Sequence, residues 1–221
     1  MCRIGLPYPV LMVDPLDAVD WPVRTERLSL RRCEAGDAES TWRFRRLPEV
    51  AEWITAAPQS FDDYRTLFLE PARLSQALVI ELADNRLVIG DIMVRIEDAW
   101  AQAEVAELAR GTQAELGWAL DPAFGGRGYA TEAVGAVIDL CFGTLGLRRL
   151  HAECFADNEP SWRLMERLGM RREARLHKES LHRSGRWLDG LSYALLAEER
   201  LPIPGRDQGI PPRPIGSSVG R

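Results

Sequence analysis

A glycine-rich turn between an alternating segment and a helical pattern is the part of this sequence with the clearest chemistry. The turn consists of Gly125, Gly126, Arg127, Gly128, Tyr129 and Ala130. A helix that begins here presents unpaired backbone N–H groups and the positive end of its dipole, and glycines let an anion approach the backbone closely. We therefore expect the turn to bind a phosphate group. A tight strand-to-helix connection that binds no ligand is the alternative.

The order of residues in the turn excludes two common nucleotide-binding loops. A P-loop carries Lys followed by Ser or Thr after its glycines, and no such pair follows here. The glycines follow the spacing G-G-x-G-x-A, whereas the dinucleotide fingerprint is G-x-G-x-x-G. The expected anion is therefore a phosphate in another type of site.

Patterns on both sides of the turn place it between a strand and a helix. Residues 115–120 alternate and predict a strand that Pro122 ends. Residues 131–142 predict a helix, because apolar side chains recur there at the spacing i, i+3, i+4, i+7. These side chains are Val134, Val137, Ile138 and Cys141.

The remaining elements predict one α/β (α+β) domain with a mixed sheet. Helices are expected at 37–46, with Asp37 at the start, at 61–74 and at 160–168. Strands are expected at 27–32, 77–83, 87–96 and 150–155, with one or two more in 171–196 around Ser184 and Gly185. Residues 101–111 form an insert, either a short helix or a loop. We divide the chain into an N-terminal arm (1–24), the domain (25–200) and a Pro- and Gly-rich tail (201–221).

Composition excludes several classes of function. The 221 residues carry a net charge of −5, so no global basic field points to nucleic acid. No apolar run approaches about 18 residues, so no membrane span is expected. None of the four cysteines has metal-ligand spacing with a histidine, so no metal site is expected. Buried free thiols favour a reducing compartment, the cytoplasm.

Residues 120–133 resemble the acetyl-CoA-binding segment of the GCN5-related N-acetyltransferases (GNAT), most closely the branch that acetylates ribosomal-protein N-termini. Three further stretches agree in order and spacing with that branch, namely residues 25–31, 158–170 and 185–193. The resemblance covers about residues 25–200. It implies a single GNAT-like domain with a central mixed, mostly antiparallel sheet flanked by helices. It also implies transfer of an acetyl group from acetyl-CoA to a primary amine by direct attack on the thioester.

The resemblance assigns roles to five residues beside the turn. Glu115 becomes the general base, which the attacking amine needs because most of it is protonated at neutral pH. Ser161 lies where the branch has a serine near the sulfur, Asn158 is expected to bind the pantetheine amide, and Trp118 and Leu120 offer main-chain groups to pantetheine. The alternatives are an exposed carboxylate for Glu115 and helix capping for Ser161 and Asn158.

The turn departs from the family pattern at one position. The family begins this pattern with Gln or Arg, or in this branch often with an aromatic residue, whereas this chain has Gly125. Because backbone N–H groups hold most of the pyrophosphate, the phosphate site is expected to survive this change. Arg127 is expected to supply positive charge.

The acceptor amine is left open among a protein N-terminus, a lysine side chain and a small cationic amine. The helices between residues 37 and 74 and the insert at 97–113 are expected to shape the acceptor cleft, with Glu104 and Glu107 as lesser candidates for the base. Transfer of another acyl group, such as succinyl, is one alternative function. A catalytically weak CoA sensor or scaffold is another, and a homodimer is possible.

Overall fold

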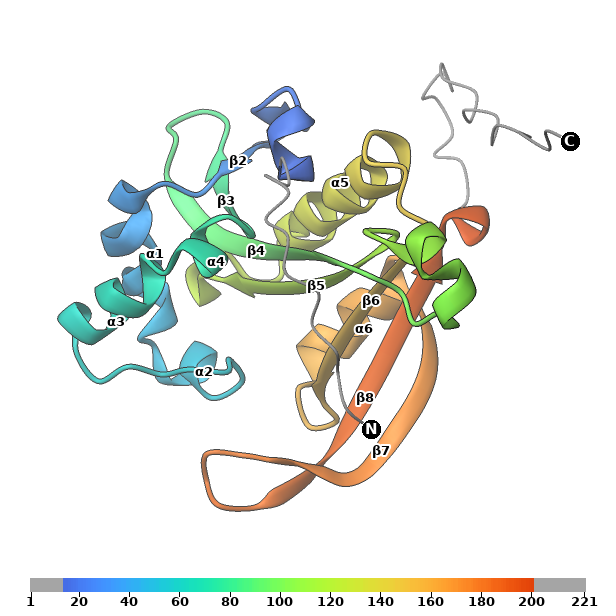
Figure 1. The fold of residues 1–221 in the computed structure, drawn as a ribbon. Coiled ribbons are helices and arrows are strands. Elements are labelled where there is room, and N and C mark those ends of the chain that lie inside the picture. Colours follow the sequence, from blue (N-terminus) through green and yellow to red (C-terminus); the bar gives the residue numbers. More distant parts are fainter. Residues whose placement is uncertain (1–13, 201–221) are drawn as a thin grey trace, which may run out of the picture.

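The computed structural model describes residues 14–200, in which eight strands form one sheet in the order β1-β2-β3-β4-β5-β6-β8-β7. Only β5 and β6 pair in parallel, so the expected mixed, mostly antiparallel sheet is confirmed (Figure 1). The strands are β1 (Val23–Arg24), β2 (Leu28–Arg32), β3 (Ala77–Leu82), β4 (Val88–Glu97), β5 (Gln113–Leu120), β6 (Arg149–Phe155), β7 (Arg171–Leu181) and β8 (Trp187–Leu196). The tail expected at 201–221 lies outside the described residues.

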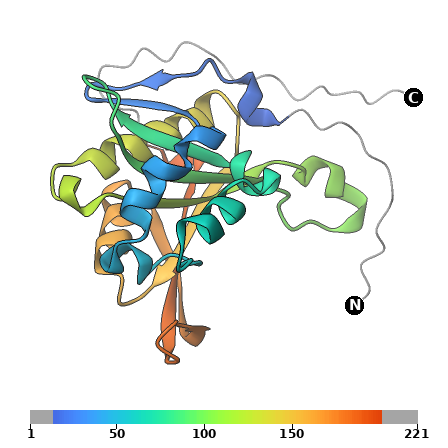
Figure 2. The ribbon, with the colours of Figure 1, turned by 90° about the vertical axis from the view of Figure 1, so that its left-hand side faces the viewer.

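Helices cover both faces of this sheet. They are α1 (Ala38–Arg45), α2 (Pro48–Ala51), α3 (Phe61–Phe68), α4 (Pro71–Leu74), α5 (Tyr129–Gly143) and α6 (Glu159–Arg167). Figure 2 looks onto the face that α1 to α4 cover, with α5 behind the sheet. None of the helices in the described range is long and apolar enough to cross a bilayer.

Alternation along the central strands builds a core on each face. In β3, Leu78 and Ile80 pack with α5, whereas Val79 between them packs with residues of α1 and α3. The predicted apolar stripe of α5, from Val134 to Cys141, is fully buried. This burial confirms the helical spacing and fixes α5, and therefore its N-terminus, on the sheet.

Two details on the α1–α4 face differ from the sequence prediction. The single helix expected at 61–74 is wrong, because Pro71 starts a separate helix, α4, after α3 ends at Phe68. Asp37 does not cap α1 with its side chain. Its carboxylate instead accepts hydrogen bonds from Arg31 at 2.7 and 2.8 Å and from the Glu34 N–H at 2.8 Å.

Residues 14–24 are part of the folded domain, although we expected an irregular arm there. Leu16 is 1% exposed within the main core, and the Trp21 indole N–H donates to its carbonyl at 2.8 Å. Val23 and Arg24 pair with β2. Pro15 and Pro22 made this stretch look irregular in the sequence, yet the side chains of Leu16 and Val19 are buried.

The parallel pair β5–β6 separates soon after it begins. Its register covers only Gln113 to Glu115 on β5, against Arg149 to His151 on β6, and the two strands then diverge (Figure 1). β6 continues paired with β8 along its whole length. From Leu116 onward, β5 therefore has a free edge that faces the gap.

Candidate active site

The glycine turn ends in the left-handed conformation that only glycine adopts readily. Gly126 and Gly128 have φ values of 72° and 80°, and Gly128 is the N-cap of α5. In the described range, the N–H groups of Gly126, Arg127 and Gly128 have no hydrogen-bond partner, and those of the first turn of α5 are free by helix geometry. The turn therefore presents a run of donors at the positive end of a 15-residue helix.

A clasp from the connection between β1 and β2 holds the turn in place. The Glu132 carboxylate of α5 accepts hydrogen bonds from the Thr25 hydroxyl at 2.6 Å and the Arg27 backbone N–H at 2.9 Å. The Arg27 guanidinium pairs with Glu132 at 2.7 Å, donates to the Arg127 carbonyl at 3.0 Å and lies over the Tyr129 ring. Thr25 and Arg27, which are far from the glycine turn in the sequence, thus contact the turn and α5 directly. Sequence reasoning missed this role.

The Glu132 clasp predicts an acid-dependent loss of stability. Burial alone would raise the pKa of Glu132, but hydrogen bonds from Thr25 and Arg27 lower it below its usual value. The stabilisation is therefore full above the unfolded-state pKa of about 4.3 and is lost as pH falls through the folded-state pKa. In calorimetry, the wild-type Tm should fall over this window and approach that of Glu132→Gln. The exposed Glu26→Gln serves as control, and parallel curves for wild type and Glu132→Gln would contradict the clasp.

One cavity of about 600 Å³ joins the β5–β6 gap to the space under α3 and α4. Four of the predicted site residues line it, namely Glu115, Trp118, Asn158 and Ser161. Leu120, the last residue of β5, and the turn at 125–130 that follows it along the chain do not line the cavity. The structure therefore brings the candidate catalytic residues, Trp118 and Asn158 into one space, and the glycine turn is not part of it.

Glu115 lies directly across from Arg95 on β4 and forms an ion pair with it. Its side chain is 22% exposed. Directly opposed residues share a face of an antiparallel sheet, and Asp91 and Met93 lie on the same face at alternate positions. This face carries α1 to α4, so the Glu115 carboxylate points to the acceptor side of the sheet. Arg95 was not among the predicted site residues, and its place follows only from the β4–β5 register.

The free edge of β5 presents the main-chain groups of Trp118 and Leu120 to the gap. The Asp121 N–H donates to the Ile89 carbonyl at 2.8 Å, which sets the alternation of hydrogen bonds along β5. Residues 117, 119 and 121 therefore bond to β4, whereas Trp118 and Leu120 direct their N–H and C=O groups toward β6. Because β6 has already diverged, these groups are available to a ligand.

Asn158 and Ser161 begin α6 at the other side of the gap. Asn158 is the N-cap of α6, but its side chain makes no capping bond and has no partner in the described range. Burial raises the pKa of the Cys154 thiol to about 11, and the nearby Ser161 hydroxyl and Arg172 guanidinium oppose this rise only in part. Cys154 is therefore a neutral thiol at pH 7, and both α6 side chains are oriented into the cavity.

The acceptor side of the cavity comes from the helices and not from the insert. Residues 45, 53–56 and 64–74 supply side chains, as expected for the segment between 37 and 74. None of residues 97–113 lines the cavity. The insert forms a 3-10 helix, Ala103–Ala109, that projects from the domain (Figure 2). Glu104 and Glu107 are exposed on it and do not line the cavity, so the structure does not bring them together with Glu115.

The β7–β8 hairpin closes one side of the acceptor space. The His182 Nε2–H donates to the Glu52 carbonyl at 3.0 Å, and Arg183 donates to the Glu52 and Ile54 carbonyls. The His182 ring also packs on Trp53 with centroids 5.7 Å apart. Because His182 is buried in this contact, we assign it a structural role.

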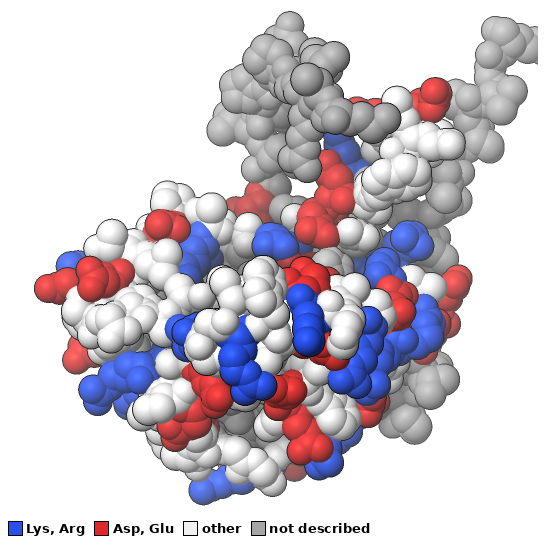
Figure 3. Space-filling view, turned by 90° about the horizontal axis from the view of Figure 1, so that it is seen from below, with Lys and Arg blue, Asp and Glu red and all other residues white. Residues whose placement is uncertain are grey.

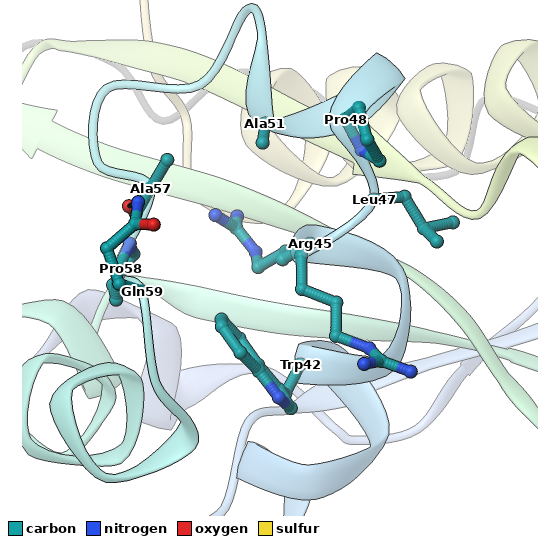
Figure 4. A pocket seen from close by; sticks show the side chains of 9 residues that line it. Trp42, Arg45, Leu47, Pro48, Ala51, Ala57, Pro58 and Gln59 are labelled. Atoms are coloured by element: carbon teal, nitrogen blue, oxygen red, sulfur yellow. Dashed lines mark hydrogen bonds between the residues drawn. The ribbon is translucent and has the colours of Figure 1, made fainter.

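A second pocket lies behind the Arg45 guanidinium. It has a volume of about 470 Å³ and lies between α2 and the loop at 57–59, with Trp42 and Arg45 directed into it (Figure 4). Arg45 also lines the main cavity and is bonded there to Asp91 at 2.5 and 2.6 Å. The pocket thus shares a wall with the candidate site but holds none of the predicted site residues.

Charges on the surface are mixed in sign. On the face seen from below, Lys and Arg side chains alternate with Asp and Glu side chains (Figure 3). On β7, Arg175 pairs with Asp189 and Arg172 with Glu166. The basic residues of this region are thus largely neutralised by carboxylates, so this face does not form a continuous basic surface.

Most of the described domain matches a known family. Residues 27–171 match the family described as the acetyltransferase (GNAT) domain. The chain is 30% identical over 178 residues to the uncharacterized N-acetyltransferase p20 of Bacillus licheniformis, a match that covers 79% of this chain and 96% of that protein. The chain belongs to the GNAT family and is an acyl-CoA-dependent N-acetyltransferase.

Other relatives show the same relationship over different lengths. The uncharacterized N-acetyltransferase YnaD of Bacillus subtilis (strain 168) is 39% identical over 85 residues, which cover 38% of this chain and 49% of YnaD. This match therefore spans about half the length of YnaD. A solved acetyltransferase (GNAT family) from Bacillus anthracis has a TM-score of 0.67 at 28% identity, covering 80% of this chain and 99% of that one.

Two more distant structures share the fold. The ribosomal-protein-S5-alanine acetyltransferase from Vibrio fischeri has a TM-score of 0.65 at 20% identity, covering 83% of this chain and 100% of that one. RimJ of Mycobacterium smegmatis, solved in complex with CoA-disulfide, has a TM-score of 0.62 at 23% identity, covering 78% and 83%. The resemblance to the ribosomal-protein acetyltransferases thus extends to the three-dimensional fold.

Proposed function

We propose that this enzyme transfers an acetyl group from acetyl-CoA to a primary amine by direct attack of the amine on the thioester. The observation that supports this best is the single cavity that contains Glu115 on one side and Asn158 and Ser161 on the other. Direct transfer requires the donor and the acceptor to meet in one space. The cavity provides such a space between the free edge of β5 and the acceptor helices.

The residues around the gap fit the chemistry of CoA. The unpaired N–H groups from Gly126 to the first turn of α5 suit a pyrophosphate, and the free main-chain groups of Trp118 and Leu120 suit the amides of pantetheine. The Asn158 amide, which has no partner in the described range, adds a further donor and acceptor. Arg127 is exposed at the turn. Its guanidinium offsets the negative charge of the pyrophosphate, in place of the side chain that Gly125 lacks.

Acetyl-CoA supplies an acyl group activated by a thiol leaving group. Glu115 removes the proton of the attacking ammonium, directly or through a water, which frees the nitrogen lone pair for the carbonyl carbon. Arg95 fixes the orientation of the Glu115 carboxylate. The Ser161 hydroxyl donates a hydrogen bond to the sulfur as the C–S bond breaks. The nitrogen then loses a second proton, which passes to the departing thiolate, so the products are an amide and a free thiol.

Binding of acetyl-CoA should raise the Tm of the protein. A ligand that binds only the folded state stabilises it by RT ln(1 + [L]/Kd), about 2.7 kcal/mol at 100 times Kd. Scanning fluorimetry with acetyl-CoA up to millimolar concentration measures this shift, and adenosine is the control without pyrophosphate. An unchanged Tm would contradict the donor assignment. Release of free thiol with a panel of amines then tests transfer itself.

A further inference from the structure

Arg73 stands apart from the other arginines of the domain. Six arginines between residues 14 and 200 are part-buried, and five of them pair with a carboxylate: Arg31, Arg32, Arg45, Arg149 and Arg200. Arg73, on α4, has neither a carboxylate partner nor a side-chain hydrogen bond in this range. Its side chain lines the main cavity. A part-buried cation without a paired anion favours binding of an anionic ligand, because the free-energy cost of its desolvation is not otherwise offset.

The surroundings of Arg73 favour a negative ligand. Burial and repulsion by the Arg45 guanidinium lower the pKa of Arg73, and attraction by Tyr64, Asp91 and the exposed Glu70 does not offset them. Two N–H groups of Arg45, on Nε and Nη2, already donate to the Asp91 carboxylate. The Tyr64 hydroxyl donates to Thr41 at 2.8 Å. The nearby groups are therefore committed to one another, and none of them neutralises Arg73.

The other carboxylates that line the cavity do not form an ion pair with Arg73. Glu115 is paired with Arg95, while Glu70 and Glu153 are exposed to solvent at the rim. Much of the remaining lining is apolar, with Trp53, Ile54, Phe68, Leu74 and Met93. Met93 lies on β4 between Asp91 and Arg95 and on the same face, so an apolar side chain separates the Arg45–Asp91 pair beside Arg73 from the Arg95–Glu115 pair.

The register of the sheet gives the approximate distance between the Arg45–Asp91 pair and the Arg95–Glu115 pair. Asp91, which Arg45 binds next to Arg73, is four residues from Arg95, which binds Glu115. Four residues at about 3.3 Å each put these two ion pairs roughly 13 Å apart along β4. Long side chains at both ends shorten the space between them, so a linear molecule with several methylene groups spans it.

We infer that the acceptor of this enzyme is an amine that also carries a carboxylate, with Arg73 binding the carboxylate and an apolar linker lying between the two groups. This inference rests on the proposed acetyl transfer and specifies its substrate class. Arg73 is then a specificity-determining residue, because a guanidinium binds a carboxylate through two parallel N–H groups. The acceptor amine itself lies at the Glu115 end.

The test compares matched ligands that differ only in the carboxylate. Isothermal titration of the CoA-saturated protein measures Kd for 3-aminopropanoate, 5-aminopentanoate and 7-aminoheptanoate, and for the n-alkylamines of the same carbon number. A charge-assisted bond predicts that the best amino acid binds at least about 10-fold more tightly than its alkylamine. Equal affinities throughout the series would overturn the inference.

Two variants test whether Arg73 is the residue that binds the carboxylate of the ligand. Arg73→Gln should weaken binding of the best amino acid by about 10-fold or more while the alkylamine changes by less than about twofold. Arg65→Gln, on the exposed surface of α3, is the matched control and should change neither value. A loss of both ligands in Arg73→Gln with an unchanged acetyl-CoA Tm shift would overturn the role of Arg73. The comparison on the wild-type protein does not depend on any variant.

Failure of this inference can be told apart from failure of the proposed function. The titrations measure binding and require no turnover, whereas acetyl transfer is measured by the release of free thiol. Discrimination between the paired ligands without thiol release would support the carboxylate site and contradict the transfer. Thiol release with alkylamines and amino acids at equal KM would support the transfer and contradict the carboxylate site.

Discussion

Replacing Glu115 by glutamine is expected to lower kcat by about 100-fold or more, because general-base catalysis contributes on the order of 10²–10⁴ in rate. The amide keeps the size of the side chain but cannot accept the proton of the ammonium. Affinity for acetyl-CoA should change by less than about twofold, since Glu115 faces the acceptor side and not the turn. Steady-state kinetics with the best amine of the panel measures kcat, and titration measures the affinity for acetyl-CoA.

Two further measurements make the Glu115 result specific. Glu107→Gln changes an exposed carboxylate on the insert, paired only with Arg110, and should leave kcat unaltered. The Glu115→Gln variant should also recover activity at higher pH, where more of the amine is already neutral. A kcat equal to that of the wild type would remove Glu115 as the base and leave it as the partner of Arg95.

Replacing Gly128 by alanine is expected to weaken acetyl-CoA binding by about 10-fold. The Gly128 backbone has φ of 80°, and an L-residue with a Cβ adopts this region at a cost of roughly 1–2 kcal/mol. If the turn relaxes out of this conformation, binding must restore it, and about 1.4 kcal/mol corresponds to a factor of ten in Kd. Titration of each variant with acetyl-CoA measures the change.

Gly143 offers a matched control at the opposite end of the same helix. A Cβ at Gly143 meets no atom within 4 Å, and its φ is not positive. Gly143→Ala should therefore leave acetyl-CoA binding unchanged and raise stability slightly, since alanine favours a helix by roughly 0.5–1 kcal/mol. Equal loss of binding in both variants would show that α5 as a whole, and not the conformation of the turn, controls affinity.

Local patterns in the sequence were enough to predict the elements that carry the site. The stripe from Val134 to Cys141 predicted α5, and the alternation at 115–120 predicted β5, because burial on one side leaves a period in the sequence. The glycines at 126 and 128 predicted the anion-binding turn, since their conformational freedom is an intrinsic property of the residue. The break at Pro71 was also visible in the sequence, although we expected one continuous helix there.

Contacts between distant residues could be seen only in the tertiary structure. Thr25 and Glu132 are 107 positions apart, and Arg45 and Asp91 are 46 apart, so no local pattern records these pairs. The divergence of β6 from β5 and the lack of a partner for Arg73 likewise depend on how whole elements pack. The sequence by itself therefore determined the strand, the glycine turn and the helix that we propose bind the acyl donor. The tertiary structure decided which charges meet in the acceptor cavity, because electrostatic pairing depends on distance in space and not along the chain.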